Sequence, residues 1–122
     1  MKEPAELQVQ IFGRRDSRDT QRALRFFAER RVKVAFVDVA RKPPALGELR
    51  RFAERFGSKA LMDSESRLYR DAGLAYLSLD DGQVLERVLA DPRLLKLPLV
   101  RAGSRVTIGV DDVAWKSWLV RT

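Results

Sequence analysis

The chain contains neither cysteine nor histidine, and these two absences exclude the most common catalytic groups. Without cysteine there can be no disulfide, no thiolate nucleophile and no zinc–thiolate site. Without histidine the chain lacks the usual general base at neutral pH, so neither a Ser-His-Asp nor a Cys-His arrangement is possible. Any catalysis would have to use carboxylate, lysine, arginine, tyrosine or hydroxyl groups. We therefore assign no catalytic residue and no metal site from the sequence.

Long apolar runs are also missing. No segment approaches the ~20 apolar residues that a helix needs to span a bilayer, and Met1–Glu6 lacks the apolar core of a secretory signal. We expect a cytoplasmic protein without membrane contact. The 122 residues, 45% of them hydrophobic and 34% charged, are typical of one folded domain, which we expect to cover residues 1–122.

The charge is strongly unbalanced, with 24 basic against 17 acidic residues and a formal net charge of +7. Such an excess favours acidic partners, and we expect either an acidic protein surface or a small oxyanion. The basic residues are scattered along the chain, which also fits an ordinary solvated surface. We do not expect direct nucleic-acid binding, because no helix-turn-helix, RNA-recognition signature or interleaving of aromatic and basic residues is present.

The first third of the chain predicts a β-α-β unit. Alternation of apolar and polar residues over Leu7–Phe12 is typical of a strand. Asp16 or Ser17 is then a good N-cap for an amphipathic helix that should end near residues 30–31. A second alternating segment begins at Val32 and ends at Asp38, and because a helix connects the two strands we expect them to be parallel.

The rest of the chain predicts helices followed by a hairpin and a last helix. Helical periodicity and breakers recur between about residues 45 and 95, which we interpret as a helical insert. Two short strands over residues 98–101 and 105–108 flank Gly103, as in a hairpin. Asp111 is placed to cap the final helix. The expected fold is α/β, with a mixed four-stranded sheet in the order β-α-β, insert, β-β-α.

The final helix carries Trp115 and Trp118, three residues apart and therefore on one face. We expect at least one of them to pack on the sheet; the alternative is a partly exposed aromatic contact for a partner. Acidic residues at predicted helix starts are explained better by capping than by a metal or acid–base pair; these are Asp63, Glu65, Asp80, Asp81, Asp111 and Asp112.

Several segments carry a resemblance to a known family in the same order and spacing. They are Ile11–Gly13 with residues 20–27, residues 37–44 with Glu48 and Leu49, Phe56 and Gly57 with residues 69–74, and residues 94–100 with the hairpin from Gly103 to Gly109. These segments are similar to the ArsC/Spx family, which is related to arsenate reductases and has a thioredoxin-like fold. The resemblance covers nearly the whole chain from Leu7 and implies a thioredoxin-like domain here.

The resemblance also implies that the family's reaction site is altered in this chain. The family's reactive cysteine lies at the start of the first helix, and Ser17 occupies that position. Its anion-binding arginines correspond to Leu97 and Val110, while a basic residue of the insert corresponds to Lys59. Pro98 matches the family's proline before the third strand, which is cis in thioredoxin-like folds, and we assign it a conformational role.

Basic residues nevertheless surround the predicted start of the first helix. Arg14, Arg15, Ser17 and Arg18 form our candidate anion-binding site, because a helix N-terminus offers free N–H groups and positive potential. Against this, neighbouring aspartates could already occupy those donors. A hydroxyl is far less acidic than a thiol, so we do not expect Ser17 to act as a nucleophile.

These observations lead to one functional hypothesis and two alternatives. The first is a cysteine-less ArsC/Spx-family protein that acts by binding or regulation, as a pseudoenzyme without a cofactor. One alternative is an arsenate reductase-like oxidoreductase that uses an external thiol such as glutathione. The other is an Spx-like transcriptional regulator that docks on RNA polymerase. The oligomeric state is open.

Overall fold

The computed structural model describes residues 7–119 and confirms the predicted mixed sheet of four strands. The sheet has the order β2-β1-β3-β4 and consists of β1 (Val9–Gly13), β2 (Val34–Asp38), β3 (Leu99–Ala102) and β4 (Arg105–Ile108). β1 is parallel to β2, as the β-α-β pattern predicts, and antiparallel to β3. β3 and β4 form the expected hairpin.

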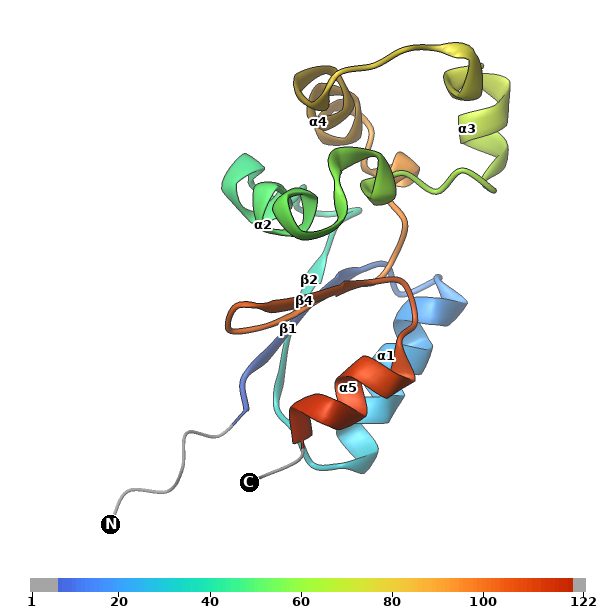
Figure 1. Ribbon diagram of the computed structural model, residues 1–122. Coiled ribbons are helices and arrows are strands. Elements are labelled where there is room, and N and C mark those ends of the chain that lie inside the picture. The colour runs from blue at the N-terminus through green and yellow to red at the C-terminus, as the bar shows by residue number, and fades with distance from the viewer. Residues whose placement is uncertain (1–6, 120–122) are drawn as a thin grey trace.

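Helices cover both faces of the sheet (Figure 1). One face carries α1 (Arg18–Glu29) and α5 (Asp112–Leu119). The other carries the insert, in which short 3-10 turns join three helices: α2 (Leu46–Phe56), α3 (Arg67–Asp71) and α4 (Asp81–Ala90). No helix of the described residues is both long and apolar enough to cross a membrane.

The period of the strands divides the apolar side chains between two cores. In β1, Ile11 packs with α1 and α5, whereas its neighbour Phe12 faces the insert and meets Phe52 of α2 edge to face. This follows from the alternation of successive side chains across a sheet. The expected packing of Trp115 and Trp118 is confirmed, because both are buried in the core beneath α1 and α5.

The start of β2 differs from the sequence prediction. The alternating pattern begins at Val32, but the strand begins at Val34. Arg31 adopts a left-handed conformation, and the N–H of Val32 donates to the carbonyl oxygen of Phe27. Because this bond closes the end of α1, the first residues of the alternating segment belong to the turn.

Candidate functional site

Ser17 is the N-cap of α1, one of the two residues that the sequence proposes for this role. Its backbone is extended, and its Oγ accepts a hydrogen bond from the N–H of Thr20 at 3.1 Å. The N–H of Ser17 donates to the carbonyl oxygen of Arg14. The hydroxyl thus satisfies one of the donors left free at the start of the helix. The side chain is half-buried and belongs to the helix end rather than to a catalytic pair.

A close approach between β1 and α1 positions this segment. Thr20 is fully buried, and its Oγ1 accepts a hydrogen bond from the N–H of Arg14 at 3.4 Å. A Cβ at Gly13 would lie 2.5 Å from two side-chain atoms of Thr20, so a glycine is needed where the strand ends. The loop from Arg14 to Ser17 is therefore attached to the helix at both of its ends.

The structure separates the four residues of the candidate anion-binding site. Ser17 and Arg18 line one open hollow of about 480 Å³ at the start of α1. The Nε of Arg14 instead pairs with Asp16, at 3.1 Å from its carboxylate. The guanidinium of Arg15 lies over the ring of Phe36, 4.8 Å from its centre. Neither Arg14 nor Arg15 lines the hollow.

Two arginines that sequence reasoning missed lie in this hollow instead. Arg22 and Arg25 follow Arg18 at helical spacing and reach the same exposed face of α1. One guanidinium nitrogen of Arg22 is 3.0 Å from a carboxylate oxygen of Asp112, at the start of α5. The spacing of four and three residues was the available signal, since residues so spaced share a helix face. Asp16 and Asp19 also line the hollow, so its charge is mixed.

The positions that match the family's arginines carry apolar side chains that contact the two cores. Leu97 is buried with the insert, and Val110 packs against the core beneath α1 and α5. The peptide bond between Leu97 and Pro98 is cis. The carbonyl oxygen of Pro98 accepts a hydrogen bond from the N–H of Gly109. Pro98 thus joins the start of β3 to the end of β4.

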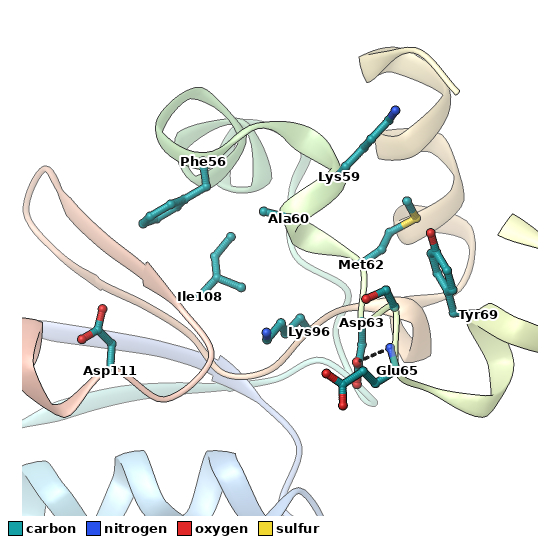
Figure 2. Close-up of a pocket in the computed structure, with 11 residues that line it drawn as sticks. Phe56, Lys59, Ala60, Met62, Asp63, Glu65, Tyr69, Lys96, Ile108 and Asp111 are labelled. Carbon is teal, nitrogen blue, oxygen red and sulfur yellow. Dashed lines mark hydrogen bonds between the residues drawn. The ribbon is translucent and has the colours of Figure 1, made fainter. Parts of the chain in front are cut away.

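A second hollow, of about 430 Å³, lies between the insert and the segment that follows β4 (Figure 2). Its basic residues are Lys59 and Lys96. In Figure 2 the amine of Lys59 points away from the other labelled side chains, whereas Lys96 lies near the middle of the hollow. Three carboxylates line it as well, from Asp63, Glu65 and Asp111. No residue from 14 to 18 lines this hollow. The lysines of the insert side and the arginines near the start of α1 therefore do not form one site.

Asp91 and Arg93 form an ion pair, with 2.9 Å between a carboxylate oxygen and a guanidinium nitrogen. The hydrogen bond from the Arg93 guanidinium, more than any other contact, holds the pKa of the Asp91 carboxyl below its ordinary value. This pair lies where the insert ends. Within residues 7–119, no group of three or more acidic side chains is arranged to hold a metal ion.

The order of the strands and helices is that of a thioredoxin-like α/β protein. Comparison with known proteins is more specific: the model of the ArsC family matches residues 14–118. An arsenate reductase of Neisseria meningitidis serogroup A is 27% identical over 105 residues, which are 84% of this chain and 90% of that protein. The chain therefore belongs to the ArsC family.

Solved structures agree with this fold. The arsenate reductase from Vibrio cholerae superposes with a TM-score of 0.81 at 18% identity, over 93% of this chain and 98% of that one. An ArsC family related protein from Bacteroides fragilis gives a TM-score of 0.82 at 15% identity, over 92% of this chain and 98% of that one. At these identities the similarity concerns the fold alone.

Proposed function

We propose that this chain is a non-catalytic member of the ArsC family, a pseudoenzyme that acts by binding or regulation in the cytoplasm. One observation carries the proposal. At the position where the family resemblance places a reactive cysteine, the Ser17 hydroxyl caps α1 by accepting the N–H of Thr20. A serine hydroxyl needs a neighbouring base to become a nucleophile, and the sequence has no histidine to supply one.

The surroundings of Ser17 support the same proposal. Oxyanion chemistry requires groups that hold the anion beside the nucleophile, but the matching positions carry Leu97 and Val110, which pack into apolar cores. The basic residues that line the same hollow as Ser17 are Arg18, Arg22 and Arg25, on the exposed face of α1. They suit an acidic protein surface or a small oxyanion, bound without turnover.

The decisive experiment is an arsenate-reduction assay on the native chain and on Ser17→Cys, coupled in turn to glutathione with glutaredoxin and to thioredoxin. Ser66→Cys is the matched control, because Ser66 caps α3 through the same 3.1 Å bond to a backbone N–H. We expect no turnover by the native chain. In Ser17→Cys, the twelve-residue α1 should lower the thiol pKa below that of the control thiol at the five-residue α3. The rate of alkylation against pH measures this difference.

The outcomes separate the alternatives. Turnover by the native chain with glutathione would overturn the proposal and support an enzyme that uses an external thiol. Turnover by Ser17→Cys alone would mean that only the nucleophile has been lost from the scaffold. If neither protein turns over arsenate, the chain has lost both the nucleophile and the groups that bind the anion, which also agrees with a binding role.

An Spx-like regulatory role has its own test, a pull-down with purified RNA polymerase. If the basic face of α1 is the docking surface, the double variant Arg18→Glu/Arg25→Glu should lose the complex. Arg67→Glu/Arg87→Glu, with both changes in the insert, should retain it. Absence of a complex with the native chain would restrict the proposal to other acidic partners.

A further inference from the structure

The outer edge of β4 offers unpaired backbone groups. In the part of the chain that the structure describes, β4 is the last strand of the sheet and pairs on one side only, with β3. The pair Ala102 and Arg105 flanks a two-residue turn in which Gly103 has φ 64°. Because hydrogen-bonded and non-hydrogen-bonded pairs alternate in an antiparallel ladder, Val106 and Ile108 direct their N–H and C=O groups away from β3. Within residues 7–119, no other segment forms a hydrogen bond with these groups.

A groove follows this edge. It has a volume of about 340 Å³, and the consecutive residues 104–107 are among those that line it. The end of α2 lines one side and α5 the other, in agreement with Figure 1, where α2 lies above the β3–β4 hairpin and α5 below it. Phe56 of α2 is 42% exposed, although it is aromatic. The groove therefore combines a strand edge with partly apolar walls, the arrangement that accepts an added strand.

The charge of the groove indicates which kind of strand would fit. Arg55, at the end of α2, has its guanidinium over the ring of Phe56, 5.1 Å from its centre. Arg105 extends from β4 itself, and both arginines are exposed. Among the described residues, neither arginine forms an ion pair. Of the residues 7–119 that line the groove, Asp111 is the one with a carboxylate, which accepts the N–H of Ala114 as the cap of α5.

A second copy of the chain is a poor occupant of this groove. Pairing β4 with β4 across a two-fold axis would bring Arg55 and Arg105 of both copies to one seam, where like charges repel. An extended acidic segment meets no such repulsion. Its alternate side chains would point toward opposite walls of the groove, one carrying Arg55 and the other reached by Arg105.

We propose that the groove along β4 binds an extended acidic segment of a partner protein, which adds to the sheet as a fifth strand. The backbone groups of Val106 and Ile108 would pair with the added strand, and Arg55 and Arg105 would select its charge. This inference deepens the proposed binding role and rests on it for the acidic character of the partner. The arsenate assay probes Ser17 and the groove experiment probes β4, so either can fail without the other.

The test uses the native chain and a short blocked peptide of alternating Glu and Val, titrated by NMR with amide hydrogen exchange. Exchange at Val106 and Ile108 should slow when the peptide is bound. Arg105 and Thr107 serve as internal references, because their N–H groups already face β3. A peptide of alternating Lys and Val is the charge control.

Charge reversal supplies the second readout. The double variant Arg55→Glu/Arg105→Glu should weaken binding of the acidic peptide by about tenfold or more. The matched control is Arg67→Glu/Arg87→Glu, which has the same change of net charge on α3 and α4, away from the groove. This control should bind as the native chain does.

Three results would overturn the inference. The first is binding of the acidic peptide without slower exchange at Val106 and Ile108, because the contact would then be electrostatic and lie elsewhere. The second is equal binding of the acidic and basic peptides, or no binding of either. The third is slower exchange at these two amides on concentrating the chain alone, which would assign the edge to a second copy.

Discussion

The role of Ser17 as the cap of α1 can be tested by removing its hydroxyl. In Ser17→Ala the N–H of Thr20 loses the acceptor that lies 3.1 Å away, while the backbone can keep its conformation. Replacing a serine N-cap by alanine costs about 1 kcal/mol of folding stability. For a chain of this length, that loss lowers the melting temperature by about 4 °C.

Two further variants at Ser17 test whether the loss of stability comes from the missing cap. Ser17→Gly should cost only a few tenths of a kcal/mol, since glycine leaves the helix end open to water. Ser17→Asp supplies another acceptor and should stay close to the native stability. The control is Ser78→Ala, because Ser78 is exposed and forms no side-chain hydrogen bond with the described residues.

Urea and thermal unfolding followed by circular dichroism would measure the series. The expected order of stability is native and Ser17→Asp first, then Ser17→Gly, then Ser17→Ala. If Ser17→Ala is as stable as Ser78→Ala, the hydroxyl does not cap α1. Ser17 would then be available for another role, and the proposal of a non-catalytic protein would lose the observation that carries it.

Three further predictions concern other contacts. Gly13→Ala should destabilise the fold by about 1–3 kcal/mol in urea unfolding, because the new Cβ meets the side chain of Thr20. Adding Thr20→Ala to the same chain should recover part of this loss, and if the losses of the two single variants simply add, the contact is contradicted. Thr107→Val removes the oxygen that accepts the buried indole N–H of Trp115 at 2.8 Å, and should lower the free energy of unfolding by about 1–3 kcal/mol. Urea unfolding followed by tryptophan fluorescence measures this loss, and an unchanged unfolding midpoint would mean that the bond contributes nothing. Asp91→Asn should lower stability at neutral pH, because the bond from Arg93 lowers the carboxyl pKa in the folded state. That stabilisation is complete above the pKa of the carboxyl in the unfolded chain, about 3.9, and disappears as the pH falls through its pKa in the folded chain. If the native chain and Asp91→Asn still differ in stability in strong acid, the ionised carboxylate is not the cause.

Much of the fold could be predicted because the patterns that carry it are local. The alternation in Leu7–Phe12 and the helical spacing after Ser17 depend only on strand and helix periods. Gly103 indicates its turn through its conformational freedom. The start of β2 could not be predicted from alternation alone, since the bond between Val32 and Phe27 is made by the returning chain.

The candidate site was only partly predictable, because side-chain direction in a loop depends on tertiary contacts. Because Arg14, Arg15 and Arg18 are close in the sequence, the sequence alone predicts that they belong to one site. In the folded chain Arg14 pairs with Asp16, and Arg15 lies over a ring from β2. Arg22 lines the hollow instead, because a helix face has a fixed period while a loop does not.

The amino-acid sequence by itself determined which chemistry is excluded and which elements form. A chain without cysteine and histidine cannot carry out thiolate or imidazole catalysis in any fold. Tertiary structure alone decided that Leu97 is buried in one core and Val110 packs against the other. It also decided that β4 lies at an edge of the sheet, with the backbone N–H and C=O groups of Val106 and Ile108 directed away from β3. The physical reason is that burial and strand order arise from contacts between segments distant in sequence, whereas composition and periodicity belong to each segment alone.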